Sequence, residues 1–428
     1  MPVQIDAIKR YASHLLLKRL EKDPGALLEP VSENFPAAML VSDIAGFTRL
    51  TEKLTQGNPM GVVELAEVLD RYIGRLIEII NEHGGDIVKF AGDALFAIWR
   101  APSEEQLAEM VYHSTQCALS IKKQLVNFEV KPGVVLNLRV GLGAGKLHVL
   151  HVGGIFERWE MLFAGEAMNQ VNQAGKLARA GEVVISPGVR RHLDEIECGQ
   201  ANWESGKYKY SGCSSNFTIG RLDSPNLPSE AETALRAYVP RVILSRLDDG
   251  QDPHLADLRQ VAVVFLKIKN FSFSDKTTLA EVQETMQLMQ NCLYRYEGSI
   301  NRFGIDDKGA VLLAAFGLPP LDHDNDALLA VLAAHELRRE LSEVGKDCVV
   351  GICTGRVFCG SVGSEIRSDY TMHGSIVNMA ASLMQAASSI LCDSATYENS
   401  KHLVVFKELE PIMVKGRNTP EAVFEPKF

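Results

Sequence analysis

The two halves of this 428-residue chain repeat one series of sequence patterns. Five pairs of segments recur in the same order, among them FPAAMLVSDIAGFTRL with QVAVVFLKIKNFSF and LRVGLGAG with VVGICTG. The spacing between paired positions falls gradually, from 224 residues between positions 43 and 267 to 209 between positions 169 and 378. Such a drift is expected when loops of different length connect one shared topology. The sequence therefore predicts two domains of the same fold.

Hydrophobic periods typical of strands and of helices alternate within each half. In the first half the expected elements are, in order, a buried strand ending at residue 43, a helix over 61–83, a hairpin over 86–99, a helix over 106–128, a strand over 136–145 and a helix over 165–180. The order β-α-β-β-α-β is the ferredoxin-like pattern. We therefore expect an α+β fold class with two ferredoxin-like domains.

Composition shifts divide the chain further. Residues 1–30 place apolar side chains at helical spacing and predict an N-terminal amphipathic helix, which packs on the body or lies on a membrane surface. The first domain is expected over 31–222 and the second over 259–428. Residues 223–258 are rich in Pro, Ser, Asp and Glu and are expected to form a linker on the surface.

Charge and cysteine content exclude several classes of function. The formal net charge of −10 is incompatible with a broad nucleic-acid-binding face, which needs clustered Lys and Arg. No apolar run approaches the roughly 18 residues of a membrane span. The eight cysteines form no CxxC pair, so a structural zinc site is not expected. These features favour a cytoplasmic protein without a transmembrane segment.

Two carboxylates interrupt otherwise apolar strands. Asp43 ends the first strand, and Asp93 lies at the tip of the hairpin that a ferredoxin-like sheet places beside that strand. A carboxylate in such surroundings is costly unless it is paired or bound to a metal. Two of them on neighbouring strands predict a site for hard divalent ions. The alternative is that Asp43 caps a helix and Asp93 serves only as a turn residue.

Several short motifs together resemble the class III adenylyl/guanylyl cyclase homology domain. They are DIAGFT from Asp43, KFAGDAL around Asp93, RVG from Arg139, GSIVN ending at Asn378 and VKG around Lys415. The tandem layout, with the degenerate copy second, is similar to the soluble, bicarbonate-responsive adenylyl cyclases. The resemblance extends from about Phe35 to the end. It implies two cyclase homology domains packed head to tail as a pseudo-symmetric heterodimer within one chain.

The resemblance also implies a catalytic site for ATP. Asp43, Asp93 and the carbonyl of Ile44 would hold two divalent metal ions, Mg²⁺ or Mn²⁺. The implied phosphate contacts are the backbone amides of Gly46, Phe47 and Thr48 and the side chains of Arg139 and Lys415.

In the second half, the resemblance assigns Asn378 to the ribose and Arg302 and Thr371 to the base. Guanylyl cyclases carry a Glu at the position of Arg302 to accept hydrogen bonds from guanine. A guanidinium has no acceptor, so Arg302 favours ATP over GTP.

Three departures from the family pattern weaken the expected activity or regulation. Lys267 stands where the first half has Asp43, so only one of the two sites is expected to be catalytic. Ser382 replaces the arginine that acts on the transition state. The degenerate pocket, a candidate site for bicarbonate or another small effector, would comprise Lys89, Asn169, Asn172 and Lys267. Asn172 replaces the relatives' effector-binding arginine, which argues against bicarbonate itself.

Three functions therefore remain open. The leading one is an adenylyl cyclase that forms 3′,5′-cyclic AMP and pyrophosphate. The second is a catalytically inactive, ATP-binding regulatory protein, and the third a module that uses the fold only for association. Because relatives of this branch often continue into large ATPase regions, further C-terminal domains are expected.

Overall fold

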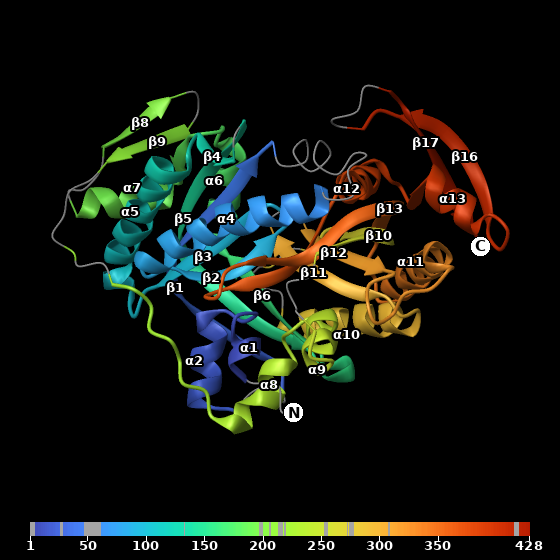
Figure 1. Ribbon diagram of the computed structural model, residues 1–428, viewed down its shortest axis with the longest axis horizontal. Helices are drawn as coiled ribbons and strands as arrows, with labels where there is room; N and C mark the ends of the chain where they lie inside the picture. Colours follow the sequence, from blue (N-terminus) through green and yellow to red (C-terminus); the bar gives the residue numbers. More distant parts are fainter. Residues whose placement is uncertain are drawn as a thin grey trace. The chain divides into compact units, whose positions relative to one another are not determined.

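The computed structural model describes residues 5–25, 29–46, 61–131, 133–196, 200–204, 207–212, 217, 220–251, 256–271, 273, 278–306, 309–414 and 419–428 (Figure 1). The chain divides into two compact units. Unit 1 comprises Met1–Leu150, Phe163–Val239 and Ser361–Tyr370. Unit 2 comprises His151–Leu162, Pro240–Gly360 and Thr371–Phe428. Each unit thus contains most of one sequence repeat and a short segment of the other.

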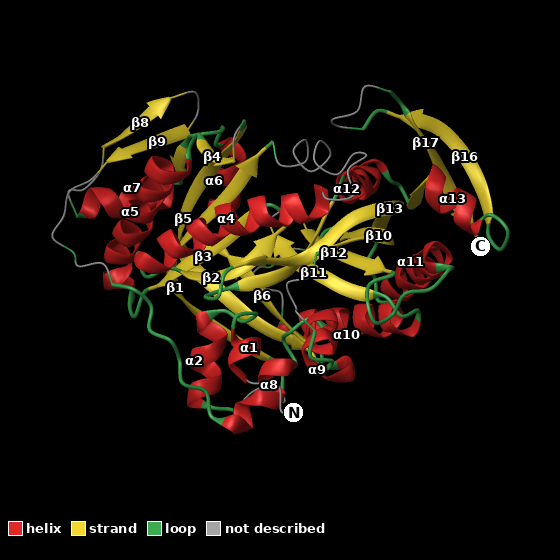
Figure 2. Ribbon diagram, in the orientation of Figure 1, coloured by secondary structure: helices red, strands yellow, loops and turns green. Residues whose placement is uncertain are grey.

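Unit 1 is built on a mixed sheet whose described strands follow the order β2-β3-β1-β5-β7-β9-β8, with β4 and β6 also paired to β5 (Figure 2). β5 and β7 pair in parallel, whereas β1 and β3 pair antiparallel. The strands are β1 (Val31–Ala45), β2 (Asp86–Ala91), β3 (Ala94–Arg100), β4 (Phe128–Lys131), β5 (Val134–Gly153), β6 (Trp159–Gly165), β7 (Val183–Ile185), β8 (Gln200–Glu204) and β9 (Lys207–Gly212).

Helices with apolar faces pack against this sheet. α5 and α6 contact β1, and α4 contacts β2. The core includes Met39 and Leu40 of β1, Leu69 and Tyr72 of α4 and Trp99 of β3, all fully buried. The helices are α4 (Gly61–Glu82), α5 (Leu107–Leu125), α6 (Glu166–Leu177) and α7 (Pro187–Glu195). Every element expected in the first half is therefore present.

Unit 2 repeats the same topology. Its described strands follow the order β11-β12-β10-β13-β15-β17-β16, with β14 paired to β13, which is the order of unit 1 with each strand replaced by its repeat mate. The strands are β10 (Asp257–Ile268), β11 (Ser299–Asp306), β12 (Gly309–Phe316), β13 (Cys348–Gly363), β14 (Ser368–His373), β15 (Ile390–Asp393), β16 (Val405–Ile412) and β17 (Glu421–Lys427). The helices are α10 (Leu279–Arg295), α11 (Asp326–Glu343), α12 (Ser375–Ala386) and α13 (Ser394–Ser400). The prediction of two copies of one α+β fold is confirmed.

One glycine in each copy lets a helix lie close on the sheet. A Cβ atom on Gly141 of β5 would lie 2.3 Å from the amide nitrogen of Gly175 in α6. A Cβ atom on Gly351 of β13 would lie 2.2 Å from the carbonyl oxygen of Ala380 in α12. Real Cβ atoms do not approach this closely, so both positions require glycine. This accounts for the glycine of the RVG sequence that follows Arg139.

The N-terminal segment differs from the expected single helix over 1–30. Two helices form, α1 (Ile5–Lys9) and α2 (His14–Lys22). Ser13 has extended backbone angles between them, and its hydroxyl accepts a hydrogen bond from the Leu16 amide at 3.3 Å, which starts α2 as an N-cap. The apolar residues Ile8 and Leu20 are fully buried in unit 1. The segment therefore packs on the body, as the first alternative held.

The expected linker over 223–258 is also more ordered than its composition suggests. It forms the 3₁₀ turn η3 (Ser229–Ala231) and the helices α8 (Glu232–Arg236) and α9 (Arg241–Asp248), and β10 already begins within it at Asp257. Leu235 and Ile243 are fully buried. Apolar residues at helical spacing are hidden among the polar ones, so composition alone misses these helices. The boundary between the units falls inside this segment, after Val239.

Two expectations concern the cellular compartment. None of the helices within the described ranges combines the length and apolarity needed to cross a membrane. Six cysteines of the described chain are buried, and none of them is in a disulfide. Cys198 and Cys213 lie outside the described residues. A cytoplasmic location stays a prediction.

Candidate active site

The fold of unit 1 brings the two predicted carboxylates together. Asp43 lies near the end of β1 and pairs with Ala94 of β3, while Asp93 occupies the turn between β2 and β3. The Ile44 amide donates a hydrogen bond to the Asp93 carbonyl oxygen at 3.3 Å, which ties the turn to β1. Asp43, Ile44 and Asp93 therefore lie at one end of two neighbouring strands.

Burial and the neighbouring carboxylate both act on Asp93. Burial, followed by the charge of Asp43 and a hydrogen bond between the two side chains, raises the pKa of Asp93 from 3.8 to about 7. The positive charge of Arg139 acts in the opposite direction. Two carboxylates this close repel each other unless a proton or a cation lies between them.

Arg139 of β5 supplies a cation on the other side of Asp43. Its Nε donates to Asp43 Oδ2 at 2.6 Å, and its Nη2 contacts the same oxygen. The Arg139 side chain is 40% exposed and that of Asp43 only 19%. The guanidinium thus links a half-buried carboxylate to the surface, a position suited to a phosphate group as well.

These residues fit a divalent metal ion. Carboxylate and carbonyl oxygens are the hard donors that Mg²⁺ and Mn²⁺ prefer, and Asp43, Ile44 and Asp93 present them on adjacent strands. Asp93 is a turn residue, as the alternative held, but its carboxylate is also hydrogen-bonded to Asp43. A plain turn aspartate would face solvent.

A β-bulge precedes one candidate side chain in each unit. The register of β2 with β3 shifts between Ile87 and Lys89. The register of β11 with β12 shifts at the repeat-related place, between Ile300 and Arg302. Bulges redirect the side chains that follow them and are common beside active sites. The hydrophobic pattern does not show these bulges, although the repeat aligns Lys89 with Arg302.

Further candidate residues of unit 2 lie on β14 and α12. Thr371 is buried in β14. Asn378 is exposed on α12, and the hydroxyl of Ser382 donates to the Asn378 carbonyl oxygen at 2.9 Å. This hydrogen bond satisfies the Ser382 hydroxyl within its own helix. His373 is buried, and burial lowers its pKa to about 4.

The copy of the metal site in unit 2 has lost its charge pair. Lys267 of β10, the mate of Asp43, pairs with Val349 of β13. Val349 is in turn the repeat mate of Arg139. The carboxylate and its guanidinium partner are thus replaced together, by an ammonium and an apolar side chain. An ammonium repels divalent cations, so this copy does not fit a metal ion.

The remaining predicted residues are placed as follows. Lys89 of β2 and Asn169 and Asn172 of α6 are half-buried in unit 1. Gly46 is exposed and has a φ of +82°, the left-handed region that glycine tolerates. Phe47, Thr48 and Lys415 lie outside the described residues.

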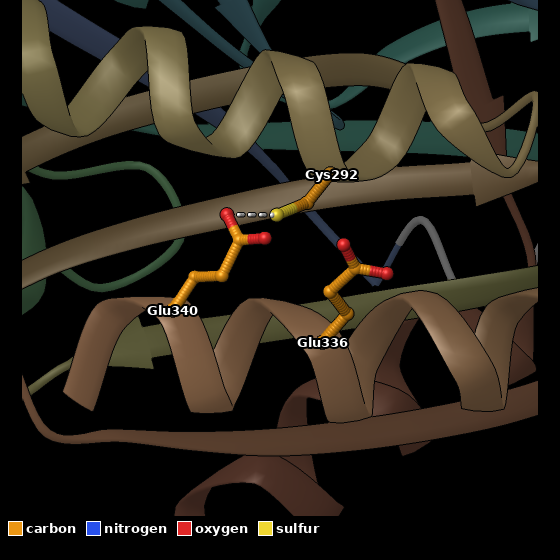
Figure 3. A group of neighbouring side chains, drawn as sticks. All are labelled: Cys292, Glu336 and Glu340. Carbon is orange, nitrogen blue, oxygen red and sulfur yellow. Dashed lines mark hydrogen bonds between the residues drawn. The ribbon is translucent and has the colours of Figure 1, made fainter. Parts of the chain in front are cut away.

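A separate cluster of possible ligands joins α10 to α11 in unit 2. Figure 3 shows the Cys292 thiol directed at Glu340, to which it donates at 3.1 Å, with Glu336 beside them. The hydroxyl of Tyr296 donates to Glu336 at 2.7 Å, and Arg295 also binds Glu336. Burial raises the pKa of Cys292 to about 12. A protonated thiol and an already bonded carboxylate make a packing contact between helices.

Comparison with known proteins begins with the domain family. The family model for the adenylate and guanylate cyclase catalytic domain matches residues 31–216 and 255–424. The two matched segments correspond to the two sequence repeats. The RVG, GDAL and GSIVN sequences all fall inside them.

Curated proteins and solved structures give matching results. Adenylate cyclase type 10 of Rattus norvegicus is 31% identical over 99% of this chain and 28% of its own length. The Homo sapiens protein of that name is 30% identical over 90% of this chain and 26% of its own length. This chain thus spans little more than a quarter of these relatives. A class III adenylyl cyclase-like ATP-binding protein from Pseudomonas aeruginosa aligns with a TM-score of 0.59 at 14% identity, over 90% of this chain and 92% of that one. This likeness shows that the two proteins share a fold.

Proposed function

This chain belongs to the family of adenylate and guanylate cyclase catalytic domains, and from that premise we propose that it converts ATP to 3′,5′-cyclic AMP and pyrophosphate. In this reaction the ribose 3′ oxygen forms a bond to the α-phosphorus, and the bond from the α-phosphorus to the bridging oxygen breaks. The hydroxyl proton passes to water. No covalent intermediate with the protein is required.

The proximity of Asp43 to Asp93 is the observation that carries the proposal. Both carboxylates survive in the copy that also keeps Arg139, although burial and repulsion raise the pKa of Asp93 to about 7. Metal ions bound there would lower the pKa of the 3′-hydroxyl and stabilise the departing charge. Asp43, Ile44 and Asp93 supply the oxygen ligands. Arg139 is positioned to donate to a phosphate oxygen from the exposed side.

The remaining residues of the proposal are taken from the cyclase family pattern. Asn378 orients the ribose, and Arg302 and Thr371 contact the adenine. Lys415 is proposed to bind phosphate on the strength of its Val-Lys-Gly surroundings, together with the amides of Gly46, Phe47 and Thr48. Arg302 offers donors and no acceptor, so ATP is the expected substrate and GTP the disfavoured one.

Ser382 favours a second candidate function, that of an ATP-binding protein with little or no turnover. The Ser382 hydroxyl is bonded to the Asn378 carbonyl and carries no charge. A preorganised donor to the transition state contributes about 3 to 4 kcal/mol, or 10² to 10³ in rate. A slow cyclase, a cyclase in which another cation such as Arg417, outside the described residues, acts instead, and an inactive ATP-binding protein are all consistent with the loss of this arginine.

The degenerate pocket is proposed to be regulatory rather than catalytic. Lys267 and Val349 replace the pair formed by Asp43 and Arg139, while Lys89 remains as a cation. A small anion is the expected class of effector. Bicarbonate added to the assay tests one such anion, and Asn172 predicts little response to it.

One assay decides between turnover and binding alone. Purified protein is incubated with ATP and Mn²⁺, and the products are separated by chromatography. Formation of cyclic AMP that is lost in Asp43→Asn and Asp93→Asn supports the cyclase. A rise in melting temperature with ATP but no cyclic AMP supports the second function, because a ligand that binds the native state stabilises it. If neither cyclic AMP nor a rise in melting temperature is observed, the third function is favoured, a module that uses the fold only for association.

A further inference from the structure

Arg367 is a buried cation that the proposed reaction does not use. It lies in the segment 361–370, which belongs to unit 1 although it lies within the second sequence repeat. Its side chain is 8% exposed. Nε donates to the Ile87 carbonyl oxygen at 3.2 Å and Nη1 to the Arg10 carbonyl oxygen at 3.2 Å, while Nη1 also binds the Ser368 carbonyl. One guanidinium therefore holds three separate stretches of chain.

The N-terminal segment is hydrogen-bonded to the same part of unit 1, at the start of β2. Asp86, the first residue of β2, accepts hydrogen bonds from the amides of His14 and Leu15 at 2.8 and 2.7 Å. Ser368 donates its amide to the Arg10 carbonyl at 2.7 Å, and the Tyr11 hydroxyl lies 3.0 Å from the Ser361 hydroxyl. The start of β2 is thus fixed by the N-terminal segment and by segment 361–370.

Arg367 contacts β2 on both sides of its bulge. The Ile87 carbonyl that it binds belongs to the last residue before the register shift. Beyond the shift, the guanidinium carbon lies 5.2 Å from the centre of the Phe90 ring. Phe90 is three residues before Asp93. A bulge bends and twists its strand, so the groups that hold it determine where the strand ends.

We propose that Arg367 is a positioning residue for Asp93, which acts by fixing the bulged strand β2 and so the separation between Asp93 and Asp43. The inference rests on the proposed metal role of these two carboxylates. Arg367 itself touches neither substrate nor metal. Its effect passes through the Ile87 carbonyl and the Phe90 ring to the turn that bears Asp93.

A displacement of the turn would weaken both metal binding and turnover. Divalent ions bind tightly only when both carboxylates reach them at once, and catalytic geometry tolerates little error. A misplacement of about 1 Å can reduce a rate about 10²-fold. Loss of the Arg367 donors also leaves the carbonyls of Ile87 and Arg10 without these bonds, so the strand is expected to shift rather than merely loosen.

The test compares two variants. Arg367→Met keeps most of the length of the side chain but has no hydrogen-bond donors. Arg367→Lys keeps the positive charge but not the several N–H donors of the planar guanidinium. Mn²⁺ affinity is measured from the electron paramagnetic resonance signal of the free ion, with no nucleotide present. The same proteins are assayed for kcat and KM with ATP and Mn²⁺. All measurements are made at a temperature at which circular dichroism shows each variant to be folded.

Arg367→Met is expected to weaken Mn²⁺ binding at least tenfold and to lower kcat at least tenfold, with less than a threefold change in the KM for ATP. Arg367→Lys should lie between this variant and the wild type. If Arg367→Met does not fold, Arg367→Lys decides by the same constants. A lower melting temperature with wild-type Mn²⁺ affinity and kcat would show a purely structural role and overturn the proposal.

Two control variants distinguish a specific effect of Arg367 on the metal site from a general loss of stability. Arg158 is the repeat mate of Arg367, since each lies seven residues before the glycine that precedes a helix, and Arg158 belongs to unit 2. Arg158→Met should leave Mn²⁺ affinity unchanged. Glu365→Gln, which removes only the exposed ion pair with Arg10, should leave affinity and kcat unchanged. Equal losses of Mn²⁺ affinity in all three variants would overturn the proposal.

Failure of the proposed function gives a different result. A wild type that binds Mn²⁺ but forms no cyclic AMP disproves the cyclase, and the Mn²⁺ affinities still decide the role of Arg367. If the wild type forms cyclic AMP and the Arg367 variants bind Mn²⁺ normally, the cyclase function is supported and the proposed role of Arg367 is disproved. A wild type that neither binds Mn²⁺ nor forms cyclic AMP overturns both.

Discussion

The proposed metal-binding role of Asp93 is opposed to its effect on stability. Its folded pKa of about 7 exceeds the ordinary 3.8, so the folded protein binds the extra proton and loses stability as the pH rises through this interval. Asp93→Asn removes the penalty. We expect the free energy of unfolding at pH 8, without metal, to rise by up to about 4 kcal/mol, since the folded and ordinary pKa values differ by about 3 and one pKa unit corresponds to about 1.4 kcal/mol. Urea titration measures it.

Asp86→Asn is the matched control for this prediction. Burial also raises the pKa of Asp86, but both its carboxylate oxygens accept backbone amides. An asparagine keeps only one acceptor, so this variant should lose stability.

Mn²⁺ should raise the melting temperature of the wild type but not that of Asp93→Asn. A metal-free Asp93→Asn protein less stable than wild type would contradict the prediction.

Ser382→Arg tests the missing transition-state cation. Ser382 is half-buried on α12, and its loss removes only the hydrogen bond to the Asn378 carbonyl. If the protein is a slow cyclase, an arginine should raise kcat at least tenfold with little change in KM, because the new contact acts in the transition state. Initial rates of cyclic AMP formation over a range of ATP concentrations measure both constants. No gain in an enzyme that already turns over well would show that another cation acts there.

His373 predicts a dependence of stability on pH. Its folded pKa of about 4 lies below the ordinary 6.5, so between these values the unfolded chain binds the proton and the folded protein does not. Stability should therefore fall as the pH drops from 6.5 toward 4, by at most about 1.4 kcal/mol per pH unit for this group. His373→Asn should flatten the slope in urea titrations between pH 7 and 5. An unchanged slope would contradict this.

At the level of elements, three glutamines on α10 hold the segment 151–162 within unit 2. The buried Gln290 accepts from the Ile155 amide at 3.3 Å and donates to the Arg158 carbonyl at 2.8 Å. Gln283 binds both the amide and the carbonyl of Gly153, at 2.8 and 2.7 Å. The neighbouring Gln287 makes one longer bond to that carbonyl, at 3.3 Å.

These hydrogen bonds predict that substitutions of Gln290 and Gln287 will lower the free energy of unfolding by different amounts. Gln290→Ala removes the hydrogen bond of the Ile155 amide and leaves a cavity in the core, while the Arg158 carbonyl keeps its bond from the Gly154 amide at 2.7 Å. The substitution should cost about 2 to 3 kcal/mol in the free energy of unfolding. Gln287→Ala removes one long hydrogen bond at a half-buried position and should cost less than about 1 kcal/mol. Urea titration of both variants compares them directly. Equal losses would mean that burial, and not the hydrogen bonds, sets the cost.

The period of hydrophobicity was sufficient to predict most elements and failed where local chemistry interrupts it. The helix α4 and the hairpin of β2 and β3 follow from clean periods of helix and strand. The break before α2 depends on the N-cap of Ser13, and the helices of the expected linker depend on a few apolar residues in a polar segment. The bulges in β2 and β11 leave no mark on the pattern.

For the whole molecule, we predict that the second copy of the fold cannot be made to bind metal by a single substitution. Lys267→Asp in an Asp43→Asn background should restore neither Mn²⁺ binding nor turnover. The reason is that the second copy lacks the cation partner as well, with Val349 at the place of Arg139. Mn²⁺ titration and the cyclic AMP assay check both points. Recovery of either would show that the second copy retains a usable site.

The sequence predicts which residues are candidates for the site, and their roles stay predictions, but it does not predict how these residues interact. The repeat and the motifs located Asp43, Asp93 and Lys267 and gave their contrasting charges. The pairing of Arg139 with Asp43, the bond of Ser382 to its own helix and the contacts of Arg367 depend on rotamers and on chain segments distant in sequence. No local pattern encodes such contacts.

The exchange of short segments between the units has a consequence for synthesis. Unit 1 is otherwise complete at Val239, yet it also contains Ser361–Tyr370. A ribosome adding about 5 to 20 residues per second needs roughly 7 to 26 s to pass from one point to the other. Throughout that interval β2, which precedes the turn with Asp93, lacks the arginine that is proposed to position it. The first repeat is therefore expected to reach its final form only after most of the second has emerged.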